Sequence, residues 1–155
     1  MNATGLFSVF LVLLLGAIAW TDFRKLTIPN PLNLLLAGTG LAYQWIFSES
    51  SALTHLAAGA AVGAAFWTIR RIHSDITGRL GLGLGDVKMA GASAIWLNPW
   101  DLPLFVFEAS AAALIYTLSR QLYGIGISLN ARQPFGPFLA VSLLLTWLAE
   151  RQFFL

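Results

Sequence analysis

The chain contains no cysteine among its 155 residues, and only 10% of its side chains are charged. The absence of cysteine excludes disulfides, thiolate metal sites, a cysteine nucleophile and CxxC elements, so any chemistry must come from oxygen and nitrogen groups. Acidic residues are scarce, with 7 Asp and Glu in total, so the position of each carboxylate is informative. The net charge of +2 is too small to indicate nucleic-acid binding.

Apolar sequence, in contrast, is abundant. Hydrophobic residues make up 57% of the chain and the mean hydropathy is +0.74, which is typical of a membrane protein. Six apolar stretches each have roughly the 17 to 20 residues that cross about 30 Å of hydrocarbon. They lie at about 5–21, 31–47, 52–69, 81–98, 102–118 and 134–150. We therefore expect an all-α, polytopic fold with about six transmembrane helices, forming one integral-membrane domain over residues 1–155.

The basic residues predict how these helices are oriented. Eight of the nine Lys and Arg lie in or beside three of the five connections between the apolar stretches. They are Arg24, Lys25, Arg70, Arg71, Arg79, Lys88, Arg120 and Arg132. Because basic loops stay on the cytoplasmic side of a membrane, we expect these connections to face the cytoplasm and both termini to face outward. All six Trp lie near the predicted span ends, where indole rings prefer the interface.

Two acids, Asp22 and Asp86, lie at the predicted cytoplasmic ends of apolar stretches. A carboxylate at a membrane boundary is expensive and is typical of a functional site. Two carboxyls brought together at low dielectric cannot both ionise easily, so one keeps its proton and the pair can hold a water between a base and an acid. This arrangement suits peptide hydrolysis. The alternative for each acid alone is a solvated carboxylate paired with a neighbouring base, Asp22 with Arg24 or Lys25 and Asp86 with Lys88.

The residues around each acid favour the functional interpretation. Pro29, seven residues after Asp22, ends a helix and leads the backbone out of the apolar stretch in a constrained turn. Gly83 and Gly85 precede Asp86, a spacing that permits close backbone approach or an unwound start to the helix. An extended substrate could lie against such exposed main chain. The alternative for the glycines is tight helix packing.

Three short motifs resemble those of the type IV prepilin peptidases, a family of the GxGD membrane aspartyl proteases. The motifs are DFRKLTIPN at residues 22–30, GLGDVK at 83–88 and PFGPFLA at 134–140. The similar positions are Asp22, Arg24, Ile28, Pro29, Asn30, Gly83, Gly85, Asp86, Lys88, Pro134, Phe135, Gly136 and Pro137. The resemblance extends from the first predicted helix to the last.

By this resemblance, Asp22 and Asp86 are the catalytic aspartates that cleave the basic leader from prepilins or pseudopilins at the cytoplasmic face of the bacterial inner membrane. The other matching residues are expected to support the motifs or the substrate. The resemblance implies no metal and no organic cofactor. Expected partners are the prepilin substrate and membrane lipid, with no nucleic acid, and the oligomeric state stays open. The sequence does not say which aspartate is the acid and which the base.

The chain departs from the longer members of this family. Those members resemble the same core with an additional cytoplasmic region near the first helix, usually carrying paired CxxC motifs. Here the first motif arrives by residue 22 and cysteine is absent. The resemblance is therefore to the short, peptidase-only members that serve Flp-type pili, and we expect no N-terminal methyltransferase insertion and no methyl transfer.

A further acid, Glu108, lies within the fifth apolar stretch. A carboxyl at that depth is expected to be protonated or hydrogen-bonded inside the bundle and to have a structural role. Intramembrane acids can also mark an ion path, so a small proton-coupled carrier is an alternative function. Against it, Asp22 and Asp86 are predicted at one depth and inverted repeats are not apparent. A third alternative is an inactive scaffold in a pilus assembly complex.

Overall fold

The computed structural model describes residues 3–47, 51–79, 81–123 and 133–153, and all regular structure in these ranges is helical. Six α-helices and one short 3-10 helix follow one another in these ranges. They are α1 (Ala3–Lys25), α2 (Asn30–Phe47), α3 (Ala52–Thr77), α4 (Leu84–Ala94), η1 (Pro99–Asp101), α5 (Leu102–Leu122) and α6 (Gly136–Phe153). The expectation of an all-α fold is confirmed for this part of the chain.

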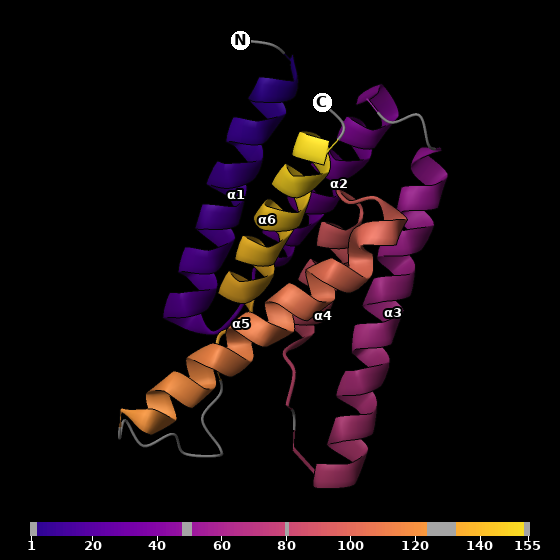
Figure 1. The fold of residues 1–155 in the computed structure, drawn as a ribbon. Helices are drawn as coiled ribbons and strands as arrows, with labels where there is room; N and C mark the ends of the chain where they lie inside the picture. The colour runs from indigo at the N-terminus through magenta and orange to yellow at the C-terminus, as the bar shows by residue number, and fades with distance from the viewer. Residues whose placement is uncertain (1–2, 48–50, 80, 124–132, 154–155) are drawn as a thin grey trace.

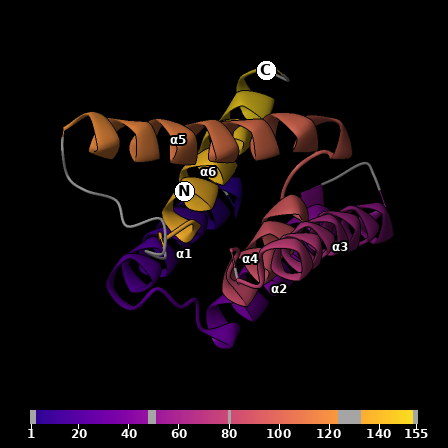
Figure 2. The ribbon, with the colours of Figure 1, turned by 90° about the horizontal axis from the view of Figure 1, so that it is seen from below.

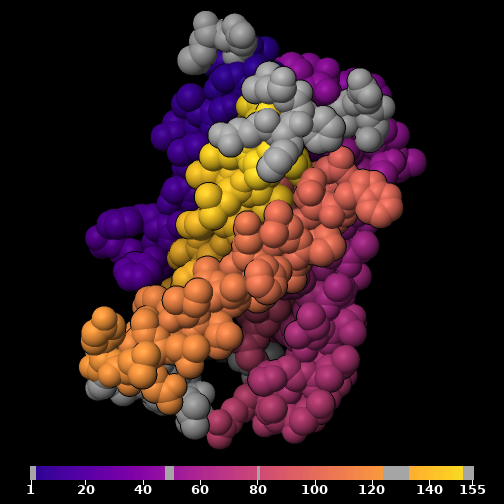
Figure 3. Space-filling model, viewed as in Figure 1, coloured from indigo at the N-terminus to yellow at the C-terminus, as the bar shows by residue number. Residues whose placement is uncertain are grey.

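The helices form one bundle in which the chain repeatedly changes direction (Figure 1). The last turn of α1 and the first turns of α2, α4 and α6 lie close together, and α3 and α5 extend below them in this view. Helix α5 crosses α6 diagonally, and Figure 2 shows α4 next to α3 and α2 on the other side. In Figure 3 the surface is hollowed below α5, between the lower parts of α5 and α3. Helix ends that are far apart in sequence therefore lie side by side.

Three helical segments among the described residues are long and apolar enough to cross a membrane: Ala3–Lys25, Ala52–Thr77 and Pro99–Leu122. Six complete spans and the side of each terminus stay predictions. The apolar stretch at 81–98 is helical only over Leu84–Ala94, and these 11 residues rise about 16 Å, less than the roughly 30 Å of a hydrocarbon layer. The glycine-containing segment before α4 and the turn after it make this helix short.

Two polar side chains of neighbouring helices stabilise the backbone that follows the last residue of α4. Gln44 of α2 donates its side-chain amide to the carbonyl oxygens of Ile95 and Trp96, both at 3.0 Å. The Nδ1 atom of His55 on α3 lies 3.0 Å from the Leu97 carbonyl oxygen. Backbone groups freed by a broken helix in an apolar environment need such partners. Gln44 and His55 therefore have structural roles.

Helices α3 and α4 pack backbone against backbone. A Cβ atom added to Gly59 would lie 2.8 Å from the Gly91 carbonyl oxygen and 2.6 Å from the Ile95 side chain. A Cβ added to Gly91 would lie 3.0 Å from the Gly59 carbonyl oxygen. A Cβ at Gly59 would collide with its neighbours and one at Gly91 would make a contact tighter than is usual, so the two glycines let α3 and α4 approach closely.

Two tryptophans depart from the expected interfacial position. Trp96 and Trp147 are fully buried, and their rings meet edge to face with centroids 6.1 Å apart. The Trp96 indole donates to the Leu36 carbonyl oxygen at 2.9 Å, which satisfies its polar atom away from water. For these two residues the predicted interfacial role is wrong, because core packing uses their large rings.

Glu108 is hydrogen-bonded between α5 and α6, as expected. The Thr146 hydroxyl donates to its carboxyl at 3.1 Å, and the hydroxyl of Ser142, which donates to the Phe105 carbonyl, lies 3.5 Å away. These two hydroxyls account for a carboxyl inside the bundle, and Glu108 lines neither of the recesses described below.

Candidate active site

Asp22 lies in the last turn of α1 and is buried, with 4% of its surface exposed. The backbone N–H of Gly136, the first residue of α6, donates to its Oδ2 atom at 2.9 Å. The N–H groups of a first helical turn have no partner inside the helix, so they are good donors to an anion. The start of α6 therefore holds the Asp22 carboxylate in place.

Gly136 has to be glycine for this contact to form. A Cβ added there would lie 2.8 Å from Asp22 Oδ2 and 3.1 Å from both Cβ and Cγ of Asp22. No real side-chain carbon approaches that closely without displacing its neighbour. The third motif of the sequence thus acts through one backbone position that touches the acid of the first motif.

The turn after Asp22 is strained. Leu26 has a φ of 50°, a left-handed conformation that costs a residue with a side chain about 1 to 2 kcal/mol. Its N–H donates to the Asp22 carbonyl oxygen at 2.8 Å and closes the last turn of α1. Leu26 lines both of the recesses around the acid. The strain is therefore located beside the Asp22 carboxyl.

Asp86 lies in the first turn of α4, and each glycine of the second motif has a steric reason. A Cβ on Gly83 would lie 2.8 Å from Asp86 Oδ2, and a Cβ on Gly85 would lie 3.2 Å from the Ile28 Cβ. Gly83 thus leaves space for the carboxyl, and Gly85 lets α4 approach the segment that follows α1. Both glycines therefore permit close packing, and their role in function stays a prediction.

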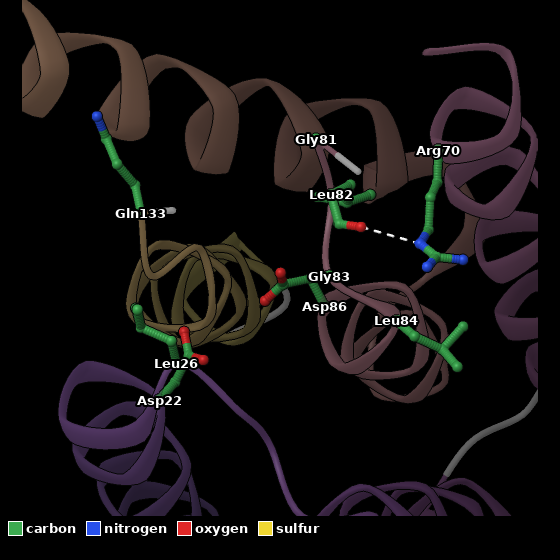
Figure 4. Close-up of a pocket in the computed structure, with 9 residues that line it drawn as sticks. All are labelled: Asp22, Leu26, Arg70, Gly81, Leu82, Gly83, Leu84, Asp86 and Gln133. Carbon is green, nitrogen blue, oxygen red and sulfur yellow. Dashed lines mark hydrogen bonds between the residues drawn. The ribbon is translucent and has the colours of Figure 1, made fainter. Parts of the chain in front are cut away.

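The two carboxylates open onto the same space (Figure 4). One recess of about 170 Å³ and another of about 500 Å³ are each lined by both Asp22 and Asp86. Arg70 and Gln133 are among the other residues of the smaller recess, and Asn30 and Lys88 are among those of the larger one. The structure therefore brings the two acids together with space on either side of them.

Asp86 lies outside the three membrane-length segments, and its surroundings disfavour its charged form. Burial raises the pKa of Asp86 from 3.8 to about 7; repulsion by Asp22 also raises it, and a hydrogen bond with the backbone of Gly83 opposes both effects. Its Oδ1 atom is buried and has no hydrogen-bond partner among the described residues. An oxygen in this position can carry the proton and donate it to a ligand.

Neither acid is paired with a neighbouring base in the described part of the chain. Asp22 accepts from Gly136, while Lys88 donates from Nζ to Asn30 Oδ1 at 2.8 Å. The one ion pair found there joins Arg71 and Asp75 on α3. The alternative of two solvated boundary pairs is therefore wrong.

Of the other residues predicted from the sequence, some lie at the starts of α2 and α6, and Arg24 lies away from the acids. The Pro29 carbonyl accepts hydrogen bonds from the first turn of α2, and the Phe135 carbonyl accepts from the first turn of α6. Pro134 lies two residues before α6, and Pro137 is the second residue of that helix. Arg24 lies with its guanidinium 4.4 Å from the Trp20 ring centroid and lines neither recess, so the structure does not bring it to the acids.

Arg70 and Gln133 are polar residues of the smaller recess that were not identified from the sequence. Arg70 of α3 donates from Nε to the Leu82 carbonyl oxygen at 2.9 Å and so holds the segment that leads into α4 (Figure 4). Gln133 accepts from the Thr117 hydroxyl at 2.9 Å. In the sequence, Arg70 is distinguished only as a charged residue at the end of a predicted span, and nothing distinguishes Gln133. Within the described residues, no three His, Asp or Glu side chains gather to hold a metal ion.

The comparisons with known proteins agree on one family. The type IV leader peptidase family matches residues 9–118. A prepilin leader peptidase/N-methyltransferase of Dichelobacter nodosus is 33% identical over 137 residues, which are 88% of this chain and 46% of the relative. A type 4 prepilin-like proteins leader peptide-processing enzyme of Escherichia coli O78:H11 is 31% identical over 121 residues, 77% of this chain and 43% of the relative. The chain thus spans about half the length of the curated relatives it matches, and no solved structure matches it.

The surroundings of Asp86 predict its titration. In the purified chain in lipid nanodiscs, carboxyl carbon NMR should show Asp86 titrating near pH 7. Asp22→Asn should lower the pKa of Asp86 because it removes the repulsion, but not to the ordinary value, because burial is the larger cause. Asp75→Asn, which changes an exposed carboxyl paired with Arg71, should leave it unchanged. A titration of Asp86 near pH 4 in the unmodified chain would show that neither burial nor Asp22 disfavours its charge.

Proposed function

Because the chain belongs to the type IV leader peptidase family, we propose that it is a membrane aspartic endopeptidase that removes the basic leader of type IV prepilins or pseudopilins. The observation that carries this proposal is that Asp22 and Asp86, from α1 and α4, line the same two recesses. The enzyme lies in the bacterial inner membrane with its aspartates facing the cytoplasm, since eight of the nine basic residues fall on their side in the predicted topology.

The surroundings of the two carboxyls support different roles for them. The N–H of Gly136 donates to the Asp22 carboxyl, while Asp86 Oδ1 has no hydrogen-bond partner among the described residues, so we assign Asp22 as the base. Asp86, with its pKa raised to about 7 by burial, is the partner that starts with the proton. An unprotonated base beside a protonated acid is the resting arrangement that amide hydrolysis by two carboxyls requires.

The reaction then proceeds in two proton-balanced steps. Asp22 takes a proton from water as the water oxygen bonds to the scissile carbonyl carbon, and Asp86 gives its proton to the carbonyl oxygen. In the resulting gem-diol the C–N bond breaks, the amine takes the proton from Asp22, and one hydroxyl proton returns to Asp86. The products are a leader carboxylic acid, which then ionises in water, and a new amino terminus, and the aspartates regain their starting states.

The recesses on either side of the acids accommodate an extended peptide across them. The segment that leads into α4 has exposed main chain at Gly81 and Gly83, and Arg70 holds the Leu82 carbonyl within it. A fixed segment of this kind can position the scissile bond against the carboxyls, which is where much of the rate is gained. We propose only the peptidase reaction for this chain, although the names of several relatives also include an N-methyltransferase.

Replacing either acid should abolish processing. Co-expression with a prepilin that carries its leader should show that Asp22→Asn and Asp86→Asn each lower leader cleavage by about 100-fold or more, because each removes a proton-transfer group. Cleavage is measured by the mobility shift of the pilin on gels, with the membrane level of each variant measured in parallel. Both a type IV prepilin and a Flp-type prepilin should be tested.

Asp75→Asn is the matched control, since it removes an exposed carboxyl that lines neither recess. Normal cleavage by either of the first two variants would overturn the paired-acid mechanism. A proton or solute flux that depends on Glu108, with no cleavage by the unmodified chain, would instead support the carrier alternative.

The start of α6 offers a second test. Gly136→Ala should lower the cleavage rate by up to about 100-fold, because its new carbon would displace the Asp22 carboxylate by a fraction of an ångström or more. Gly16→Ala is the control on α1, since no atom lies within 4 Å of the carbon that it adds. Equal cleavage rates for these two variants, at equal membrane levels, would show that the contact between Gly136 and Asp22 does not position the acid.

A further inference from the structure

A long apolar groove adjoins the candidate active site. Its walls are α2 and α3 and its floor is α4, the helix that carries Asp86. Figure 2 shows α4 next to α3 and α2, and it packs against both of them. The groove has a volume of about 760 Å³ and an almost wholly apolar lining, with Leu34 and Ala37 on one wall and Val87 on the floor.

The groove opens into the larger recess of the two aspartates. Asn30, Leu84 and Lys88 line both. Along α3 the groove runs from Leu56 to Trp67, about 16 Å at the rise of a helix, or roughly half the thickness of a hydrocarbon layer. A chain lying in the groove would therefore pass from within the membrane directly to the carboxyls.

The α3 wall is made of small residues where the groove is open. Ala60 and Ala64 line the groove and are exposed. A Cβ added to Gly63 would meet only the Gly91 Cα, at an ordinary 3.8 Å, so packing between α3 and α4 does not require a glycine there. Small residues let the backbone of another helix approach closely in a membrane. The contact of α3 with α4 explains Gly59, but it leaves this part of the wall unoccupied.

The mouth of the groove can hold main chain that leaves a helix. There the side-chain oxygen of Asn30 accepts from Lys88 Nζ at 2.8 Å, and both residues line the recess of the acids. An amide and an ammonium together offer donors and an acceptor to backbone groups that lose their helical partners. The junction is thus polar at the point where an apolar helix would have to unwind to reach the carboxyls.

We propose that this groove binds the apolar segment of the substrate next to the scissile peptide, as a membrane-embedded helix that leads into the aspartate pair. This inference rests on the proposed function. The substrate is the occupant that the continuity with the recess favours, because a chain in the groove has its next residues at Asp22 and Asp86. The groove would then select substrates by an apolar helix beside the cleavage point, and the carboxyls would cut where that helix ends.

The test fills the groove without touching the acids. Ala60→Leu and Ala64→Leu place larger side chains into it, whereas Ala61→Leu and Ala65→Leu make the same change at exposed positions of α3 outside it. Purified variants in nanodiscs are given two substrates: a full-length prepilin and a soluble peptide that spans its cleavage point but lacks the apolar segment. The two groove variants should raise KM for the prepilin about tenfold with little change in kcat, because they compete for the volume of the helix. Cleavage of the short peptide should not change in any of the four variants.

Photo-crosslinking identifies the occupant directly. A benzophenone amino acid placed at position 64 in an Asp22→Asn background should crosslink to the apolar segment of the prepilin, and the same group at position 65 should not. The proposal is overturned by unchanged KM in the groove variants, by equal crosslinking from positions 64 and 65, or by crosslinks only to lipid or to a second copy of the chain. If the unmodified chain cleaves neither substrate, the proposed function itself has failed, which is a distinguishable result.

Discussion

The hydrogen bond from the Gly136 N–H to the Asp22 carboxylate joins two parts of the chain 114 residues apart, and the candidate site depends on it. It requires that the first turn of α6 meet the last turn of α1 at the same depth. A residue larger than glycine would collide with the carboxyl that it is meant to hold. The contact between the Gly136 N–H and Asp22 therefore fixes the orientation of the carboxyl and also joins α6 to α1.

Helix α4 supplies the second acid because it is short. The helix has only 11 residues and begins at an exposed residue, Leu84, yet the side chain of Asp86 in its first turn is buried. Breaking a helix within an apolar bundle frees backbone carbonyls, and Gln44 and His55 satisfy them at the far end. Before the first residue of α4, Arg70 donates to the Leu82 carbonyl. Neighbouring helices thus offset the cost of placing Asp86 where it is.

The sequence identified the carboxylates, which are rare in an apolar chain. It missed residues whose role depends on a contact that only the fold creates. Asp22 and Asp86 could be selected because carboxylates at the ends of apolar stretches are rare and costly. The glycines around Asp86 were visible, but their separate contacts, one with the carboxyl and one with Ile28, depend on distances that a spacing pattern does not contain. Arg70 carries one of many boundary charges, and only the fold turns its guanidinium toward Leu82.

The helix assignments show the same limit. Hydropathy predicted an all-α chain, since apolar runs of this length have few other solutions in lipid. It could not show that α4 ends at Ala94, because the residues that follow are as apolar as those before them. Position near a span end also suggested interfacial tryptophans, yet Trp96 and Trp147 fill the core. Where a side chain packs is decided by its partners, which hydropathy does not report.

Whether Asp22 and Asp86 face each other across one pocket can be measured directly by crosslinking. The chain has no cysteine, so Asp22→Cys and Asp86→Cys together introduce the only thiols. A short bifunctional thiol reagent should join them within one chain in nanodiscs. It should not join Asp22→Cys to Asp101→Cys, since Asp101 lies by Glu150, 14 residues and about 21 Å along α6 from Gly136. Free reaction of both thiols with a monofunctional reagent, but no crosslink between positions 22 and 86, would contradict a shared pocket for the two acids.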